Sequence, residues 1–281
     1  MINNKFSELS GKVAIITGAS RGIGRACALA LAKQGIYTVI AAKSTQNTDI
    51  LPGTIYSVSE ECSKYTKSLP YQLDLRYPET AKECIDFTVK NFGNVDILIN
   101  NASALWWKSI TKTPLSKYDL INNVNAKGSF AMVQACLPYM EDKNWGHIIN
   151  MSPPITIGNF SNKTAYYISK YGMSLVALGV AHEYEGKGIA GNTLWPATII
   201  ESFASINHNL GNEKMWRKPE IIADAVLNIL LEDPKTFTGN MLIDEHYLRS
   251  KGITDFIKYR CHPDFEPPML DLFDNETNSK L

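Results

Sequence analysis

The sequence predicts a single doubly wound α/β domain, in which helices cover both faces of a parallel sheet. Short runs rich in β-branched residues alternate along the chain with longer amphipathic stretches. This alternation is typical of right-handed βαβ units, whose strands form a sheet that is buried on both sides. No linker rich in proline, glycine and serine interrupts it before about residue 244. We therefore expect one domain over residues 1–244 and a C-terminal extension over residues 245–281.

The apolar pattern places each element of this fold in order. The expected strands are residues 12–17, 36–41, 95–100, 147–150, 189–195 and 241–243. The expected helices are residues 22–34, 55–68, 77–92, 116–143, 163–185 and 219–232. Because parallel strands all end at one edge of the sheet, where such folds bind ligands, the residues that follow each strand are the first candidates for a site.

The composition excludes several classes of function. The chain has 281 residues, and its 28 basic side chains balance 28 acidic ones, which argues against nucleic acid or an anionic membrane as the main partner. The five cysteines are scattered, without the close pairs of a metal site, and indicate free thiols in a reducing compartment. The N-terminus lacks the apolar stretch of a secretory signal, and no apolar run reaches the roughly 18 residues of a membrane span. We expect a soluble intracellular protein without a metal ion.

A glycine-rich turn directly follows the first expected strand. Residues 17–24 read TGASRGIG and open the first expected helix. Gly18 and Gly22 allow a tight turn, and Gly24 lets helix and strand approach closely, so the helix N-terminus can present its N–H groups to a pyrophosphate. Glycines also occur in ordinary turns, but the strand before and the helix after favour a Rossmann dinucleotide site. The expected cofactor contacts in this turn are Gly18, Ser20, Arg21, Gly22, Ile23 and Gly24.

The residues after the second strand indicate which dinucleotide binds. NAD enzymes usually place Asp or Glu here to accept a hydrogen bond from the ribose 2′-hydroxyl, whereas residues 41–45 read AAKST and contain no carboxylate. Lys43 and Arg21 are cations that could meet the 2′-phosphate of NADP. A solvated surface lysine is the alternative for Lys43. The missing acid favours NADP as the cofactor.

A tyrosine and a lysine four residues apart are candidates for a catalytic acid–base pair. The spacing occurs at Tyr139/Lys143, Tyr166/Lys170 and Tyr247/Lys251. On a helix each pair shares a face, so the spacing alone does not choose between them. Only Tyr166 has Ser152 fourteen residues before it, at the end of the expected strand 147–150 and so at the ligand-binding edge. We therefore assign the chemistry to Tyr166 and Lys170.

These residue types suit proton transfer to a carbonyl oxygen. A phenol with its usual pKa of about 10 exchanges protons poorly near neutrality. The ammonium of Lys170, together with a positively charged nicotinamide ring, is expected to favour the phenolate and lower the pKa of Tyr166. Ser152 can donate a hydrogen bond to the substrate oxygen. Asn125, a polar residue between two apolar ones, is either a structural amide or a residue that holds water in a proton relay.

With these motifs the sequence resembles the short-chain dehydrogenase/reductase family over about residues 10–244. The resemblance rests on the glycine turn, on the tyrosine–lysine pair with its serine, and on an Asn-Asn-Ala segment at residues 100–102. Four further segments are similar to the hydroxysteroid dehydrogenase-like protein 2 group, namely residues 152–154 (SPP), 171–174 (YGMS), 194–196 (LWP) and 237–240 (FTGN). The chain departs from the family pattern at Ser103 and at Ala197, where the family has glycine.

The resemblance implies an oxidoreductase and extends the predicted site. The catalytic tetrad of the family corresponds to Asn125, Ser152, Tyr166 and Lys170. Further cofactor contacts correspond to Asp74 beside the adenine, to Asn101 and Ala102, and to Pro196 and Ile199 near the nicotinamide. The family also implies a homo-oligomer. We expect an NADP-dependent enzyme that interconverts a carbonyl and a secondary alcohol; the alternative is a sensor or scaffold of the same fold that binds NADP and turns over weakly.

Two tryptophans and the C-terminus bear on the substrate and the location. Trp106 and Trp107, together with residues 198–216, flank the expected substrate position and suit a lipophilic carbonyl such as an acyl or sterol-like compound. The tryptophans are equally typical of core or dimer contacts. Residues 279–281 read Ser-Lys-Leu, a signal that the peroxisomal import receptor recognises at a C-terminus. We expect a peroxisomal protein, and a cytoplasmic one if the tripeptide is a chance match.

Overall fold

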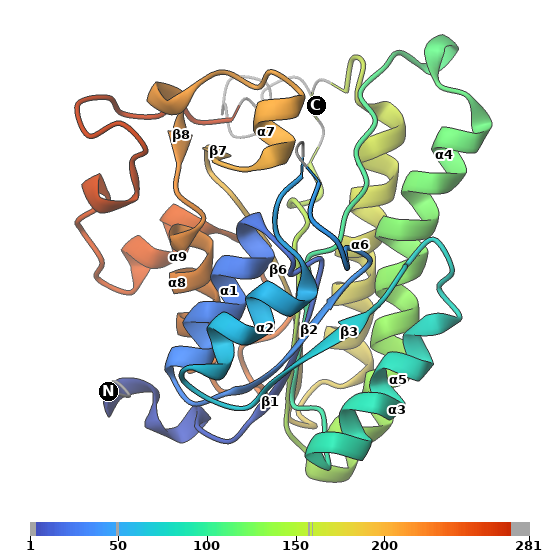
Figure 1. Cartoon of the computed structure of the whole chain (residues 1–281), viewed down its shortest axis with the longest axis vertical. Helices are drawn as coiled ribbons and strands as arrows, with labels where there is room; N and C mark the ends of the chain where they lie inside the picture. The colour runs from blue at the N-terminus through green and yellow to red at the C-terminus, as the bar shows by residue number, and fades with distance from the viewer. Residues whose placement is uncertain (1–3, 49–50, 157, 159, 271–281) are drawn as a thin grey trace.

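A parallel sheet runs through the centre of the computed structural model (Figure 1). Within residues 4–48, 51–156, 158 and 160–270, which the structure describes, its seven strands are β1 (Val13–Thr17), β2 (Tyr37–Ala42), β3 (Ser68–Gln72), β4 (Ile97–Asn100), β5 (Gly146–Asn150), β6 (Ile189–Trp195) and β9 (Met241–Ile243). Their order is β3-β2-β1-β4-β5-β6-β9, so β1 lies between β2 and β4. The strand order reverses beside β1, which is the point of a doubly wound sheet where ligands bind.

Two layers of helices cover the faces of this sheet (Figure 1). One layer holds α1 (Gly22–Lys33), α2 (Ile55–Ser63), α8 (Glu220–Ile229) and α9 (Asp244–Ser250), and the other holds α3 (Thr80–Phe92), α5 (Gly128–Lys143) and α6 (Thr164–Glu183). Alternate strand residues point to the two layers: Ala14 and Ile16 belong to the first, and Ile15 to the second. The predicted doubly wound fold is confirmed, because both faces of the sheet are apolar and both are covered.

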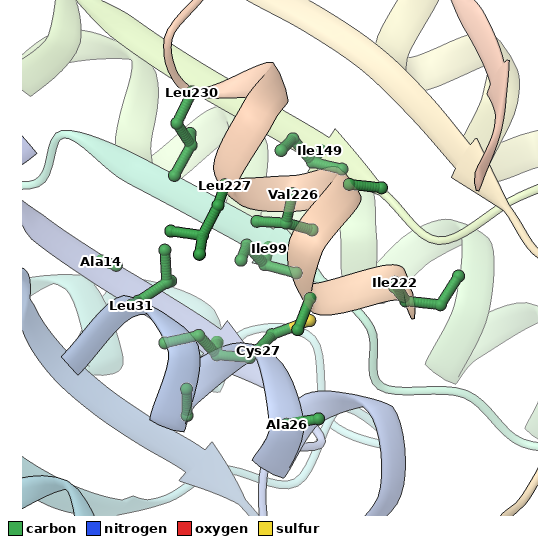
Figure 2. Packing of buried hydrophobic residues seen from close by; sticks show 14 of the residues in the cluster. Ala14, Ala26, Cys27, Leu31, Ile99, Ile149, Ile222, Val226, Leu227 and Leu230 are labelled. Carbon is green, nitrogen blue, oxygen red and sulfur yellow. The ribbon is translucent and has the colours of Figure 1, made fainter. Parts of the chain in front are cut away.

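The first layer anchors the helix that opens at the glycine turn. Cys27 and Leu31 of α1 face Val226 of α8, and these side chains lie over Ile99 of β4 and Ile149 of β5 (Figure 2). All five are fully buried. Full burial of a large apolar side chain contributes roughly 1.5–3 kcal/mol. Helix α1 is therefore held firmly against the sheet, and its N-terminus has a fixed place at the sheet edge.

The expected helix over residues 116–143 is a continuous helical run with an irregular turn in its middle. Helix α4 (Leu115–Asn122) passes into a π-helical turn, η3 (Asn123–Lys127), before α5 begins. A π turn adds one residue to the helix and changes which side chains face inward. Here it buries Asn125 completely.

Strand β3 differs from the prediction, which extends a helix to residue 68. Helix α2 ends at Ser63, and the chain then pairs with β2 from Ser68 to Gln72. β3 is an edge strand, and only its first residue is buried. Its Pro70 is tolerated there because one side of an edge strand has no partner. A half-exposed edge strand lacks the continuous apolar run of a buried parallel strand, so the sequence pattern does not reveal it.

Short elements stand beyond the carboxyl edge of β6. Strand β7 (Ile199–Ile200) pairs with β8 (Trp216–Arg217) in a separate small sheet, and α7 (Phe203–Asn207) lies between them along the chain. Figure 1 shows these three elements together at one end of the main sheet. The 3₁₀ turns of the described chain are η1 (Asn4–Leu9), η2 (Ile110–Lys112), η4 (Glu213–Met215) and η5 (Ile257–Tyr259). The β7–β8 group therefore stands beside the edge where β6 ends.

The C-terminal extension begins as part of the body. Tyr247 and Leu248 of α9 are buried in the same core cluster as α1 and α8, and so are Phe256 and Tyr259. Among the described residues, no helix is long and apolar enough to cross a membrane. Residues 279–281 lie outside the described residues, so the import signal stays a prediction.

His147 in β5 is expected to make the stability of the fold depend on pH. The ring is fully buried against Trp145, with ring centroids 5.0 Å apart, and burial lowers the pKa of His147 to about 4. An unfolded histidine has a pKa of about 6.5, so unfolding takes up a proton between these values and stability falls as the pH falls through that window. Between pH 7 and pH 5, the free energy of unfolding should drop by about 2 kcal/mol more in the wild type than in His147→Leu.

Urea denaturation at the two pH values measures this difference, and the comparison cancels the contributions of other titrating groups. His182 lies exposed on α6 and provides the matched control. We expect His182→Leu to follow the wild type at both pH values. The same pH dependence in His147→Leu and in the wild type would show that the buried ring is not responsible.

Candidate active site

The glycine turn forms a cradle that side chains would fill. Gly18 and Gly22 have φ angles of +66° and +54°, in the left-handed region that favours glycine. A Cβ atom on Gly18 would lie 2.8 Å from the Cα of Ala102, and one on Gly24 would lie 2.6 Å from Nδ2 of Asn101. Both distances are too short for real contacts. The backbone therefore stays bare on this side of the turn.

The N-terminus of α1 beside this cradle fits an anion. Its N-cap residue, Arg21, has an extended backbone and makes no side-chain hydrogen bond to the first turn, which contains no acidic residue. Ser20 is buried in the turn, and Ile23 is half-buried at the start of the helix. An uncapped helix start offers its N–H groups and the positive end of its dipole to a phosphate. At the point where the strand order reverses, this geometry fits the pyrophosphate of a dinucleotide.

Hydrogen bonds join the turn after β1 to the segment after β4. Thr17 Oγ1 accepts from the main-chain N–H groups of Asn101 and Ala102, at 3.0 Å each. The side-chain amide of Asn101 donates to the main-chain oxygens of Thr17 and Gly18, at 2.9 and 3.3 Å. The structure therefore places Asn101 and Ala102, two of the predicted cofactor contacts, against the glycine turn.

The predicted contacts for the adenosine end lie where β2 and β3 end. Lys43 directly follows β2 and is exposed. Arg21 donates to the main-chain oxygens of residues 51–53 at 2.9 to 3.3 Å, so its guanidinium holds that loop. Asp74 accepts hydrogen bonds from Arg76 at 2.8 and 3.0 Å, which lower the pKa of Asp74, and the charge of Lys43 lowers it further. Arg21 is thus engaged by the protein, whereas Lys43 stands exposed at this end.

Helix α6 brings Tyr166 and Lys170 together at the carboxyl edge of the sheet. Both side chains are buried, and Lys170 Nζ lies 5.9 Å from the centroid of the Tyr166 ring. The lysine donates a hydrogen bond to the main-chain oxygen of Met151, just after β5, at 2.8 Å. Burial lowers the pKa of Lys170 to about 7. A proton can therefore be gained or lost at this nitrogen near neutrality.

The pKa of Tyr166 moves in the direction opposite to the prediction. Burial raises it above the usual range of a phenol, Tyr167 adds to the rise, and a hydrogen bond from the Ser103 hydroxyl opposes it. The hydrogen bonds of Lys170 go to Met151 and Met173 instead of to the phenol. The prediction that Lys170 lowers the pKa of Tyr166 is therefore wrong for the chain by itself, because loss of hydration outweighs the nearby ammonium.

Ser152 is fully buried at the end of β5, where the sequence places it. Its hydroxyl lies 3.0 Å from the hydroxyl of Ser174, which donates to the main-chain oxygen of Pro153 at 2.6 Å. Ser174 is a residue that the sequence analysis did not single out. Its position four residues after Lys170, and so on the same face of α6, is the signal that could have revealed it.

Asn125 acts as a clamp between two segments of the site. Its Oδ1 accepts from the main-chain N–H of Ala104 at 2.8 Å, and its Nδ2 donates to the oxygen of Ala104 at 3.0 Å. Nδ2 also donates to the hydroxyl of Ser169 at 2.9 Å. Both amide protons are thus used within the protein. Of the two roles left open by the sequence, the side chain has the structural one.

The chain just after β6 is held from two sides. The N–H of Ala197 donates to Oδ1 of Asp244 at 2.8 Å, and the oxygen of Ala197 accepts from the N–H of Leu270 at the same distance. Burial raises the pKa of Asp244 to about 6. Pro196 and Ala197, at the predicted nicotinamide end, are therefore fixed by α9 and by the C-terminal extension.

The next two residues divide between a structural and an open role. Ile199, predicted to present its main chain to the cofactor, is paired with Trp216 in the β7–β8 sheet. Thr198 is fully buried, and its hydroxyl has no hydrogen-bond partner in the described part of the chain. The sequence analysis did not single out Thr198. A hydroxyl two residues after Pro196, at a strand end, is the signal that points to it.

The remaining tyrosine–lysine pairs and the tryptophans fall into place around this site. Tyr247 donates to Glu232 at 2.9 Å and Lys251 forms an ion pair with the same carboxylate, so this pair is structural. Trp107 meets the Tyr166 ring edge-on, with centroids 6.1 Å apart. One of the two predicted tryptophans therefore borders the catalytic tyrosine. Among the described residues, no group of three metal-ligating side chains could hold a metal ion.

The sequence model of the family described as short chain dehydrogenase matches residues 12–209, from β1 past the Tyr166–Lys170 pair. The chain belongs to the short-chain dehydrogenase family. It is 43% identical to hydroxysteroid dehydrogenase-like protein 2 of Bos taurus over 273 residues, which make up 96% of this chain and 65% of that protein. The chain thus spans slightly less than two thirds of the length of this curated relative.

Solved structures agree with the fold. A crystal structure from Xanthomonas campestris has a TM-score of 0.90 and 40% identity, covering 94% of this chain and 98% of that one. A short chain dehydrogenase of Mycobacterium thermoresistibile has a TM-score of 0.86 and 39% identity, covering 94% of this chain and 95% of that one. Both similarities extend well beyond the glycine turn, so the whole described sheet is that of the family.

Two more distant structures contain a cofactor. A metagenomic short-chain oxidoreductase in complex with NADP has a TM-score of 0.71 and 25% identity, covering 84% of this chain and 98% of that one. Carveol dehydrogenase of Mycobacterium avium in complex with NAD shares the fold, with a TM-score of 0.74 and 21% identity over 84% of this chain and 97% of that one. The fold therefore binds nicotinamide dinucleotides of both kinds.

Proposed function

We propose that this protein transfers a hydride between a nicotinamide dinucleotide, preferentially NADP(H), and a lipophilic carbonyl compound or the corresponding secondary alcohol. One observation carries the proposal: the buried phenol of Tyr166 stands with Lys170 and Ser152 at the sheet edge where the bare glycine cradle opens. The cradle and the uncapped start of α1 suit a dinucleotide. The three side chains suit proton exchange with an oxygen.

The chain's own residues account for the steps around the hydride, which the nicotinamide would supply or accept when bound in the cradle. Ser152 can donate a hydrogen bond to the substrate oxygen and so orient it. Tyr166 donates its phenolic proton to that oxygen when a carbonyl is reduced, and takes the proton back when an alcohol is oxidised. Because burial raises the pKa of Tyr166, the phenol holds its proton until the substrate oxygen becomes basic.

Lys170 supports the phenolate that remains after the proton has moved. Its Nζ is fixed on the oxygen of Met151, 5.9 Å from the Tyr166 ring centroid, and has a pKa of about 7. The nitrogen can therefore take up a proton when a negative charge forms beside it. A positive charge at this distance favours the phenolate.

The surroundings of Tyr166 support a lipophilic substrate. Trp107 packs edge-on against the phenol, and the adjoining Trp106 is also partly buried. An apolar wall beside the reacting oxygen excludes water and favours an acyl or sterol-like carbonyl. The exposed apolar side chains Phe130, Ile168 and Leu175 on α5 and α6 support the predicted homo-oligomer.

The proposal is tested by offering the purified protein a panel of ketones and aldehydes of increasing chain length, with NADPH and NADH side by side. We expect reduction of the longer apolar members, followed as loss of absorbance of the reduced cofactor, with a higher kcat/KM for NADPH. Saturable NADPH binding without turnover on any member, in either direction, would favour the sensor or scaffold.

Replacing Lys43 by aspartate is expected to reverse the cofactor preference. The exposed cation follows β2, in a segment without an acid, and suits the 2′-phosphate that NADPH carries and NADH lacks. A charge-assisted contact of this kind is worth about 1.5–3 kcal/mol, so Lys43→Asp should weaken NADPH binding roughly 10- to 100-fold. NADH binding should change by less than about threefold, measured by cofactor fluorescence titration.

Lys235 offers the control for this charge reversal. It is exposed in the loop between α8 and β9, at the opposite edge of the sheet. Lys235→Asp alters the net charge by the same amount and should leave both dissociation constants unchanged. Equal weakening of NADPH and NADH by Lys43→Asp would mean that Lys43 does not distinguish the two cofactors.

A further inference from the structure

Ser103 stands where the family resemblance has glycine, and its hydroxyl reaches the phenol of Tyr166. We propose that Ser103 is a positioning residue for the reaction, and that its hydroxyl holds the phenolic oxygen of Tyr166 so that the phenolic proton points to the substrate. This inference rests on the proposed function and adds a residue to its machinery. A glycine at this position has no group that could do the same.

The main chain on both sides of Ser103 is fixed by buried side chains. The N–H of Ala102, before it, donates to Thr17 Oγ1 at 3.0 Å. The N–H and oxygen of Ala104, after it, bind the Asn125 amide at 2.8 and 3.0 Å. Thr17 and Asn125 are both fully buried. Ser103 itself is exposed, so its hydroxyl lies at the border between the buried phenol and the open side of the site.

Tyr166 is fixed by the same clamp. The hydroxyl of Ser169 donates to the main-chain oxygen of Tyr166 at 2.6 Å and accepts from Nδ2 of Asn125 at 2.9 Å. The ring is held between two aromatic edges, with centroids 6.1 Å from Trp107 and 5.9 Å from Tyr167. Asn125 therefore ties the segment that carries Ser103 to the turn of α6 that carries Tyr166, so the two hydroxyls keep their distance.

The donor and acceptor count of the phenol gives this contact a chemical role. A phenol has one proton to donate and lone pairs to accept, whereas a serine can donate its own proton. When Ser103 donates to the phenolic oxygen, the phenol proton stays available for the substrate. The other acceptor near the Ser103 hydroxyl, the oxygen of Ala104, is 3.4 Å away and thus a weaker partner.

The other polar groups of the site are engaged elsewhere. Lys170 donates to the oxygen of Met151, and Ser152 is paired with Ser174. The bond from Ser103 also opposes the rise that burial causes in the pKa of Tyr166. Because a donated hydrogen bond favours the charged form of its acceptor, Ser103 should ease formation of the phenolate in both reaction directions.

The contact is tested directly by NMR of protein labelled with ¹³C at the ζ carbon of tyrosine. The chain has 13 tyrosines, and the resonance that is missing from Tyr166→Phe identifies Tyr166. In Ser103→Ala this resonance should move, and in Ser103→Thr, which keeps the hydroxyl, it should return toward the wild-type position. Ser109→Ala, in the same loop and away from the phenol, is the control. A Tyr166 resonance that is unmoved in Ser103→Ala overturns the proposal.

The role in the reaction is tested by the pH profile of kcat/KM for alcohol oxidation. In Ser103→Ala the acidic limb should shift upward by about one pH unit, equal to a tenfold loss at a fixed pH on that limb. The dissociation constant of NADPH should stay unchanged and Ser103→Thr should recover the profile. A profile that coincides with that of the wild type overturns the proposal. Failure of the proposed function looks different, since the wild type itself then lacks turnover while the NMR comparison still decides the contact.

Discussion

Replacing Tyr166 by phenylalanine is expected to lower kcat by roughly 10²- to 10⁴-fold, the usual contribution of a positioned general acid–base group. The variant loses the only proton that the ring can give to the substrate oxygen. Its packing should survive, because the edge-on contacts with Trp107 and Tyr167 involve the ring and not the hydroxyl. The dissociation constant of NADPH should therefore stay within about twofold of the wild type, since the cradle is built from β1, α1 and the segment after β4.

Tyr139 provides a matched control for this substitution, because it has the same spacing to Lys143 but lies near the end of α5. Tyr139→Phe should retain the activity of the wild type. Steady-state turnover with the best carbonyl of the panel, together with a cofactor titration, measures both effects. If Tyr166→Phe kept more than about a tenth of the wild-type kcat, the assignment of the proton donor to Tyr166 would be wrong.

The sequence predicted the layered fold because buried parallel strands and their covering helices have strong apolar patterns. Strands β1, β4, β5 and β6 are buried nearly throughout, and their positions follow from the sequence within a few residues. Strand β3 does not, because its half-exposed residues carry no such pattern and its pairing with β2 is a contact between distant segments. Edge strands are specified by their neighbours more than by their own residues.

The candidate site divides in the same way. Tyr166, Lys170 and Ser152 could be predicted from one strand end and one helix face, which are local features. The sign of the pKa shift of Tyr166 could not, because it depends on burial by segments remote in sequence. The same holds for the clamp of Asn125, whose partners Ala104 and Ser169 lie 21 and 44 residues away.

Arg217 joins the C-terminal extension to the body and should carry the largest effect on stability. Its side chain is 1% exposed and forms ion pairs with Glu245 of α9 and with Glu266, the latter at 2.5 Å. Glu245 follows Asp244, whose carboxylate holds Ala197 beside the predicted nicotinamide end. The buried guanidinium therefore links β8, α9 and the extension at the border of the site.

Arg217→Met should lower the free energy of unfolding by roughly 3–5 kcal/mol, the usual cost of removing one partner of a buried ion pair. The substitution keeps most of the apolar volume but leaves the carboxylate of Glu245, which is 7% exposed, with Arg249 as its remaining ion-pair partner. For a chain of this length the change corresponds to a decrease in Tm of roughly 10 °C. Thermal and urea denaturation at pH 7 measure it.

Two further variants separate an unpaired buried charge from a simple loss of packing. Glu266→Gln removes the partner whose side chain is 56% exposed, and should cost no more than about 1 kcal/mol. In Arg217→Met/Glu245→Gln the carboxylate left behind is neutralised, so the double variant should be more stable than Arg217→Met alone. A double variant that is less stable than the single one would instead attribute the loss to packing around Phe256, which the guanidinium covers at 5.6 Å from the ring centroid.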